Sequence, residues 1–597
     1  MTAKAPSTEA SALALQTVAA PARPRVSGDA IGQAGSRDAL AQLTAAMAEL
    51  KAISLRPILQ RAVDAIHAED FKAAFHWTHQ ALEKDECNGF AWYLMGIVKE
   101  RQADFASSIK AYEAALTLIP EHAEVANDLG RLAFRMGMKP QAEKLFRHFL
   151  VHHPDHPEAT NNLACALRDQ SLFEEAIETL RPAILKNPES AQLWNTMGTV
   201  MSEQGDFTHA EVFFQEALRV DDDFYKARYN LGNARVVLGD PAGALEACEA
   251  ALLRVVAEDE RQMMRLARST ILMALGRVGE AWDEYEARNH PLASDTTHYL
   301  FDRPRWEPGS DFTGRSLMVV AEQGLGDEIL FSNLLPDVIE RLGPEGRLTL
   351  VVEPRLVEMF QRTYPAARVR AHATYDVGGK TVRFAPTLTE ELESIDLWVP
   401  MGSLLREFRR SVGSFPTRVG FVTPDAERVA HWRKVLEDAP AGVKIGLLWK
   451  SGITKGARQR FFSPFEQWAP VLKAKGACFV NLQYGDCAEE IALAERDLGV
   501  RIWTPPGIDL KQDLDDVAAL CCALDLVVGF SNATLNIAAA CGAPTWLISA
   551  PWAWTLLGTA RYPWYPQVRT FTTRAPGDWG PVMETVGEAV EAFTAER

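Results

Sequence analysis

Residues 526–546 read LVVGFSNATLNIAAACGAPTW, and this stretch decides the fold of the C-terminal half of the chain. Its first five residues are apolar and rich in β-branched side chains, which predicts a buried parallel strand. The polar turn 531–534 then caps a helix expected from about Asn532 to Cys541, and a second strand begins at Thr545. This order places free N–H groups at the carboxyl edge of a sheet, where phosphate-bearing ligands bind. An ordinary capped βαβ unit would have the same pattern.

Strand and helix patterns alternate through two successive units around this stretch. The first unit has expected strands at 316–323, 347–353 and 395–401 and expected helices at 327–342 and 354–364. The second has expected strands at 443–449, 477–483, 500–503 and 526–530 and expected helices at 514–524 and 581–593, with a bridging helix at 425–436. This alternation predicts two Rossmann-like domains, at residues 313–440 and 441–597.

A repeat of 34 residues occupies most of the N-terminal half. Three series follow this spacing: Ala62, Gly96, Gly130, Ala164, Gly198 and Gly232; Ala81, Ala115, Ala183, Ala217 and Ala251, with Phe149 in the remaining place; and Pro120, Pro154 and Pro188. Small residues where paired helices cross, and a proline after the second helix, are typical of tetratricopeptide (TPR) repeats. We therefore predict a TPR α-solenoid over residues 55–290, with six repeats and a degenerate seventh near 265–288 as a cap.

Two further segments flank this array. Residues 1–50 are rich in Ala, Thr, Ser and Pro, which predicts a flexible leader with a helix near 38–51. Residues 291–312 are interrupted by Pro and Gly and are predicted to be a linker.

Asparagines recur at one position of the repeat. Asn127, Asn161 and Asn195 lie 34 residues apart, three residues before the small packing residue. A column of amides along a groove would hold an extended peptide through bidentate hydrogen bonds to its backbone. Local hydrogen bonding within the repeats is the alternative interpretation.

The net charge of −17 argues against general nucleic-acid binding, which needs a basic face. The eight cysteines include no CxxC pair, so the sequence predicts reduced thiols rather than a zinc site or a disulfide framework. No apolar run approaches the length of a membrane span. We expect a cytoplasmic protein with no bound metal or cofactor.

A glycine turn follows the first strand of the first unit. Gly324 and Gly326 would let an acceptor substrate approach the backbone closely, and Asp327 follows them directly. A carboxylate at this edge is a candidate general base for an acceptor hydroxyl. A helix cap is the alternative role for Asp327.

The second unit holds candidates for binding a nucleotide sugar. Cations follow its first strand, an amide follows the next strand, and small polar residues follow residues 526–530. The candidate donor-binding residues are Lys450, Arg458, Arg460, Gln483, Ser531, Asn532, Thr534 and Asn536. Clustered cations in an acidic chain indicate an anion-binding site, although a solvated surface loop would have the same composition.

The sequence resembles bacterial TPR-linked glycosyltransferases whose catalytic half is related to heptosyltransferases. The resemblance rests on WEPG at 306–309, AEQGLGD at 321–327, GLLW at 446–449 with LQYG at 482–485, and LDL at 524–526 continuing to Trp546, followed by PWYP at 563–566. It implies a GT-B fold, with the donor nucleotide on the C-terminal domain and the acceptor on the other. It also implies Asp327 as the base. The closest resemblance is to flagellin-modifying glycosyltransferases, which implies a nonulosonic, pseudaminic-type acid from a CMP-activated donor.

The sequence differs from this family at the donor lobe. Ser531-Asn532 and Asn536 stand where members usually carry an Asp-Ser/Thr pair and a His, and Trp552-Ala553-Trp554 aligns with Trp-Arg-Trp. We expect a protein O-glycosyltransferase that modifies Ser or Thr of flagellin, or of another protein held in the TPR groove, with a nucleotide sugar as co-substrate. The alternatives are a transferase acting on lipopolysaccharide or polysaccharide, and a non-catalytic TPR adaptor with a degenerate transferase domain.

Overall fold

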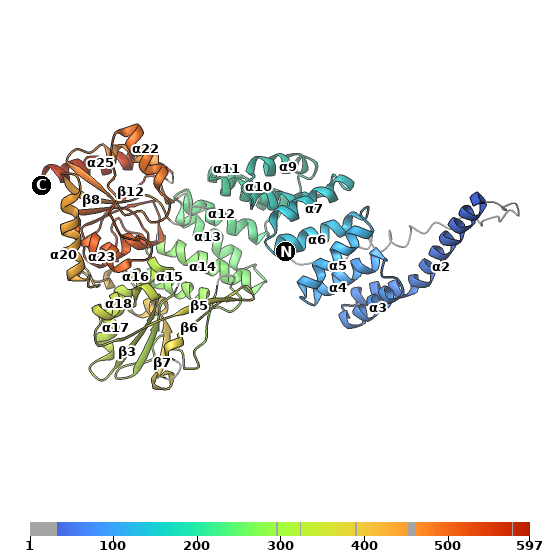
Figure 1. The fold of residues 1–597 in the computed structure, drawn as a ribbon, viewed down its shortest axis with the longest axis horizontal. Coiled ribbons are helices and arrows are strands. Elements are labelled where there is room, and N and C mark those ends of the chain that lie inside the picture. Colours follow the sequence, from blue (N-terminus) through green and yellow to red (C-terminus); the bar gives the residue numbers. More distant parts are fainter. Residues whose placement is uncertain (1–32, 294–295, 323, 389–390, 452–460, 576) are drawn as a thin grey trace. The chain divides into compact units, whose positions relative to one another are not determined.

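The computed structural model describes residues 33–293, 296–322, 324–388, 391–451, 461–575 and 577–597. The chain divides into two compact units, Met1–Val200 and Met201–Arg597. The described part of the first unit is helical, and the second unit contains helices and three β-sheets (Figure 1). Among the helices described, none is long and apolar enough to cross a membrane.

Helix pairs follow one another through the first unit. Their bounds are α2 Gln33–His67, α3 Phe71–Lys84, α4 Gly89–Arg101, α5 Phe105–Leu118, α6 Ala123–Arg135, α7 Lys139–His152, α8 Pro157–Arg168, α9 Phe173–Lys186 and α10 Ala191–Gln204, which ends in the second unit. The small residues of the 34-residue repeat lie where paired helices touch. A Cβ atom added to Gly96 would lie 2.5 Å from Cδ1 of Tyr112, and one added to Gly130 would lie 2.8 Å from Cε1 of Phe146. The predicted role of these small residues is therefore confirmed.

The first helix of the array begins earlier than the sequence analysis placed it. α2 runs without a break from Gln33 through position 50, where the flexible leader was predicted to end. The stretch 39–52 is rich in alanine and contains neither Gly nor Pro, and alanine has the highest helix propensity. The prediction of a helix near 38–51 is correct, and residues 1–32 of the leader lie outside the described residues.

The second unit starts with further helices of the same kind. These are α11 Phe207–Val220, α12 Tyr225–Val237, α13 Pro241–Leu252, α14 Glu258–Ala274 and α15 Val278–Tyr285, followed by the 3₁₀ turn η1 Glu286–Asn289. The last pair packs on the α/β region. Trp282 of α15 is fully buried, makes edge contacts with Phe331 and Trp564, and donates its indole N–H to the carbonyl of Arg409 at 2.9 Å. This agrees with the predicted cap near 265–288.

The first α/β layer is a four-stranded parallel sheet in the order β4-β3-β2-β7. Its strands are β2 Ser316–Val320, β3 Arg347–Val352, β4 Arg368–Ala371 and β7 Leu397–Pro400, and its helices are α16 Leu325–Phe331, α17 Leu335–Leu342, α18 Val357–Thr363 and α19 Leu405–Phe408. Counting from the first strand, the order is 3-2-1-4. The order in which successive strands are added to the sheet therefore reverses between β2 and β7, which is where open α/β sheets form their ligand crevice.

The second α/β layer is a five-stranded parallel sheet in the order β12-β11-β10-β8-β9. Its strands are β8 Val443–Leu448, β9 Ala477–Asn481, β10 Leu526–Phe530, β11 Thr545–Ser549 and β12 Arg569–Thr572. The accompanying helices are α20 Ala426–Val435, α21 Ala469–Leu472, α22 Ala488–Leu498, α23 Leu514–Ala523, α24 Ala533–Ala540 and α25 Trp579–Ala595. One face of the sheet shares a core with α23 and α24, and the other shares a core with α25 (Figure 1). The order 2-1-3-4-5 puts the crevice between β8 and β10.

A small third sheet, in the order β1-β6-β5, consists of β1 Thr297–Tyr299, β5 Ala373–Val377 and β6 Lys380–Phe384. Short 3₁₀ turns complete the region: η2 Ser332–Leu334, η3 Pro354–Leu356, η4 Pro386–Leu388, η5 Leu392–Ser394, η6 Met401–Leu404, η7 Val412–Ser414, η8 Leu436–Asp438, η10 Phe465–Trp468 and η11 Trp554–Leu556.

Two local expectations need correction. The predicted linker 291–312 supplies β1 and the buried Trp306, whose backbone N–H donates to the carbonyl of Trp398 at 2.8 Å, so part of its described residues packs on the first sheet. The predicted strand 500–503 is reduced to one isolated bridge between Trp503 and Val480, because Pro505 and Pro506 follow Thr504 and cannot continue the ladder. The domain boundaries drawn from the sequence stay predictions.

Candidate functional site

The carboxyl edge of the second sheet carries the turn predicted between residues 531 and 534. Oδ1 of Asn532 accepts the N–H of Leu535 at 3.0 Å and so caps α24, while Ser531 is exposed at the end of β10. Thr534 lies in the first turn of α24 and is buried. The positive dipole end of α24 thus lies beside the β8–β10 crevice, a suitable place for a phosphate group.

The two α/β layers meet where α16 packs on α24. A Cβ atom added to Gly326 would lie 3.4 Å from the backbone nitrogen of Ala533, and the Asn536 amide donates to the Gly326 carbonyl at 3.5 Å. Gly326, which was predicted to contact the acceptor, therefore lies where α16 packs closely on α24, and its role toward the acceptor stays a prediction. Gly324 is exposed and precedes α16.

Tyr562 joins the same junction and was missed by the sequence analysis. Its hydroxyl lies 3.3 Å from Oγ of Ser531 and 3.4 Å from Oδ1 of Asn536. Burial raises the pKa of Tyr562 to about 12, and the nearby charge of Asp327 contributes to the rise. A tyrosine directly before the PWYP segment was the available signal. The structure thus brings Ser531 and Asn536 together at the Tyr562 hydroxyl, and Asn536 in turn contacts Gly326, the residue before Asp327.

Asp327 occupies the third position of α16. Its Oδ2 accepts the N–H of Gly324 at 3.3 Å, and its own N–H donates to the Gly324 carbonyl at 2.9 Å. The side chain is half-buried. These contacts are those of a helix cap, and the half-buried carboxylate at the edge of the sheet can also accept a proton.

A buried carboxylate–imidazole pair follows Asp327. Oε1 of Glu328 lies 3.1 Å from Nε2 of His372, and its other oxygen accepts the N–H of Glu353 at 2.9 Å. Nδ1 of His372 is 3.4 Å from the hydroxyl of Thr374 in β5. The pair thus connects α16 to the small sheet. The sequence contained no local signal for it, because 44 residues separate its two members.

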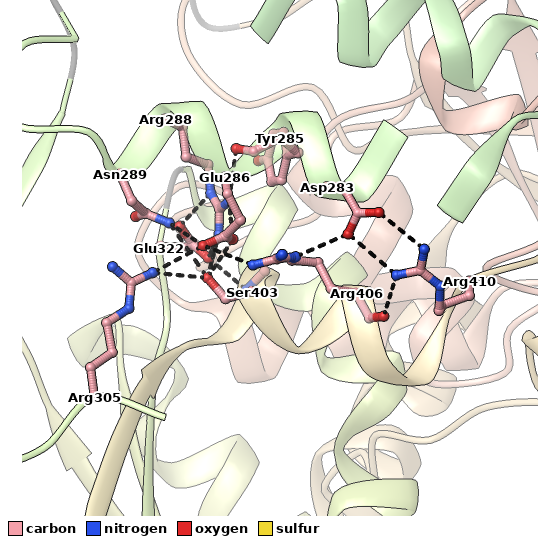
Figure 2. A network of polar contacts seen from close by, with 11 residues as sticks. Asp283, Tyr285, Glu286, Arg288, Asn289, Arg305, Glu322, Ser403, Arg406 and Arg410 are labelled. Atoms are coloured by element: carbon pink, nitrogen blue, oxygen red, sulfur yellow. Dashed lines mark hydrogen bonds and ion pairs between the residues drawn. The ribbon is translucent and has the colours of Figure 1, made fainter. Parts of the chain in front are cut away.

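A polar network fills the crevice between β2 and β7 (Figure 2). Arg288 of η1 donates to both carboxylate oxygens of Glu322, at 2.8 and 2.7 Å, and the side chains are 4% and 2% exposed. Glu322 also accepts the N–H of Gly402 at 2.6 Å, and Ser403 donates to Glu286 at 2.7 Å. The turn η1, which follows the last helix pair, therefore occupies the place where an open α/β sheet of this order would bind a ligand.

The predicted donor-binding cations and amide are only partly described. Arg458 and Arg460 lie outside the described residues. Lys450 forms an ion pair with Glu490 of α22. Gln483 is buried, and its Oε1 accepts the backbone N–H groups of Trp449 and Lys450 at 3.0 and 2.9 Å. Gln483 therefore holds the loop after β8 in place, and its side chain does not face an open site.

The asparagine column also makes contacts between repeats. Asn161 is 2% exposed, and its Oδ1 accepts the hydroxyl of Thr196, 35 residues on, at 2.5 Å. Tyr93 stands at the same repeat position and donates to Asp128, again 35 residues on, at 2.8 Å. Asn161 therefore links one repeat to the next through this hydrogen bond, and its amide is buried rather than exposed to a bound peptide. Asn127 and Asn195 are half-buried.

Comparison with known proteins agrees with the repeat architecture. The tetratricopeptide repeat family model matches residues 93–157, 127–192, 161–223, 195–260 and 229–294. Protein FlbA of Caulobacter vibrioides is 48% identical over 572 residues, which cover 96% of each chain.

Solved structures match the chain over a smaller part. A tetratricopeptide repeat protein from Parabacteroides merdae is 15% identical, covering 40% of this chain and 93% of that one, with a TM-score of 0.36. MamA from Desulfovibrio magneticus is 18% identical, covering 29% and 97%, with a TM-score of 0.27.

Proposed function

We propose that this chain, which belongs to the family of Protein FlbA from Caulobacter vibrioides, is a protein O-glycosyltransferase acting on flagellin. The repeats recognise the acceptor protein, and the α/β region is a GT-B transferase. The flagellin acceptor and the pseudaminic-type, CMP-activated donor come from the resemblance described under "Sequence analysis".

One observation carries the proposal of catalysis. Asp327 at the start of α16 and Ser531 just before α24 lie on the facing carboxyl edges of two parallel sheets; Ser531 contacts Tyr562, and the charge of Asp327 contributes to the raised pKa of the same phenol. When the carboxyl edges of two parallel sheets face each other, one edge can bind the acceptor and the other can bind the nucleotide of the donor. Contact between α16 and α24 through Gly326 and Asn536 keeps the two edges together.

The proposed reaction uses these groups in a simple sequence. The carboxylate of Asp327 accepts the proton of a Ser or Thr hydroxyl, and the oxygen forms a bond to the anomeric carbon of the sugar. The bond from that carbon to the phosphate oxygen breaks, and the nucleoside monophosphate leaves with the bonding electrons. The N-terminus of α24 then faces the charge that develops on the phosphate.

A non-catalytic adaptor is the second candidate. The capping contacts of Asp327 and the ion pair between Lys450 and Glu490 favour it, because both groups already have structural partners.

Replacing Asp327 with Asn separates the two candidates. An amide keeps the capping contacts but has no proton affinity near neutral pH. Transfer should fall about 10²–10⁴-fold while the thermal transition changes little. The measurement is the intact mass of flagellin from cells carrying each variant. Asp425→Asn is the matched control, because Asp425 caps α20 by accepting the N–H groups of Glu427 and Arg428 at 3.0 Å. Full modification by Asp327→Asn would remove Asp327 from the mechanism and favour the adaptor.

A further inference from the structure

The small sheet leaves one strand edge open. Its order is β1-β6-β5, and β5 pairs with β6 alone among the described strands (Figure 1). Residues 374–379 of β5 and the following turn are exposed. An exposed edge strand presents unpaired N–H and C=O groups that can pair with another extended chain.

The hairpin turn determines which groups face the open edge. Gly378 and Gly379 both have positive φ, 62° and 78°, as a two-residue type I′ turn requires. Val377 and Lys380 are then the hydrogen-bonded pair that closes the hairpin. Because bonded and non-bonded pairs alternate in an antiparallel ladder, Tyr375 also bonds to β6, whereas Thr374 and Asp376 point their N–H and C=O groups outward.

The pairing of β6 on its other side agrees with this assignment. The carbonyl of Arg383 accepts the N–H of Leu300, which follows β1, at 3.1 Å. Arg383 lies opposite Thr374 in the register, so both residues of this non-bonded pair direct their backbone groups away from the hairpin. The open edge of β5 therefore offers two donors and two acceptors.

The side chains of β5 do little to block this edge. Tyr375 and Val377 are 56% and 61% exposed on one face of the strand, and the Tyr375 ring stacks on Phe384 at 5.7 Å. The strand contains neither Pro nor Lys, the residues that commonly protect edges. Its acidic residue, Asp376, accepts the N–H of Gly379 at 3.0 Å within the turn.

The open edge begins at the candidate site. Thr374 contacts His372, and His372 contacts Glu328, the neighbour of Asp327 in α16. Arg383 donates to Thr374 at 3.0 Å and to the carbonyl of Ala321 after β2 at 2.6 Å, so the hairpin is fixed to the carboxyl edge of the first sheet. A chain paired with β5 would therefore run up to the edge that carries Asp327.

We propose that an extended segment of the acceptor protein adds to β5 as a fourth strand and so leads its hydroxyl residue to Asp327. The free groups of Thr374 and Asp376 bind two alternate residues of the segment through its backbone, and Tyr375 and Val377 contact apolar side chains on one face. This inference rests on the proposed function for the identity of the partner.

Two substitutions at one position test it. Asp376→Pro removes the outward N–H, and proline is tolerated where a strand N–H faces solvent. Asp376→Ala is the matched control, because it also loses the contact with Gly379 but keeps the N–H. In cells, Asp376→Pro should lower the modified fraction of flagellin about three- to tenfold, as expected for one lost hydrogen bond, and Asp376→Ala should leave it unchanged.

Hydrogen exchange provides an independent readout with the purified full chain and monomeric flagellin from cells lacking this protein. The amides of Thr374 and Asp376 should exchange fast in the free protein and slow at least tenfold when flagellin is added, whereas the amide of Tyr375 should be protected throughout. Protection without any mass change in cellular flagellin would support strand addition and contradict glycosylation. Equal modification by the Pro and Ala variants, or protection that grows with the concentration of the protein alone, would overturn the proposal.

Discussion

Replacing Arg288 with Met should destabilise the second unit by about 3–5 kcal/mol, the cost of breaking a buried ion pair by removing one partner. The pair is bidentate, at 2.8 and 2.7 Å, and both side chains are at least 96% buried. After the substitution, Glu322 would keep one described donor, the N–H of Gly402. The Glu322 carboxylate would then be buried without its cationic partner, and an unpaired buried charge is strongly destabilising.

Two comparison variants make the prediction specific. Arg410 belongs to the same network but is 52% exposed in its pair with Asp283, so Arg410→Met should cost about 0–1 kcal/mol (Figure 2). Adding Glu322→Gln to Arg288→Met removes the orphaned charge and keeps an acceptor for Gly402. The double variant should therefore recover part of the loss.

The assay is native-state hydrogen exchange of the buried amides of Met318 and Val319 in β2, which reports the free energy of opening where the network is anchored. If Arg288→Met changed these amides no more than Arg410→Met, the pair would not stabilise the fold. If the double variant were as unstable as the single one, the loss would not come from an unpaired charge.

Two further predictions concern α15 and the turn η1 that follows it. In a chain ending at residue 295, the amides of α15 should lose protection from hydrogen exchange, because Trp282 would no longer contact Phe331 and Trp564. Unchanged hydrogen exchange in α15 would show that the cap is stable without the α/β region. Burial opposes ionisation of Glu286, but Arg288, Ser403 and Arg305 together outweigh it and hold the pKa of that carboxyl below 4.5. Its stabilising contribution is therefore present above pH 4.5 and lost as the pH falls through the lowered folded pKa, so opening of α15 should become easier in acid. An equal acid response in Arg288→Met would contradict this.

The repeats and the α/β layers could be predicted because their signals are local. Gly96 and Gly130 mark helix crossings at a fixed spacing, and the structure shows that a Cβ atom at either would clash with a ring of the partner helix. The strand, cap and helix of residues 526–541 could be predicted for the same reason, because Asn532 caps α24 by accepting the N–H of Leu535, only three residues away. The catalytic role of Asp327 stays a prediction, because its local contacts suit a cap as well as a base.

Contacts between residues distant in sequence were decided only by the tertiary structure. Tyr562 meets Ser531 and Asn536, and Arg288 enters the crevice beside Glu322, through the order in which the strands pair. Asn161 was predicted to line a groove, but its amide faces the next repeat, where Thr196 satisfies it. Sequence periodicity determines which residues share a helix face, whereas the partner of that face depends on how the elements pack. The amino-acid sequence alone therefore determined the elements and their repeats, and packing decided which polar groups remain available for function.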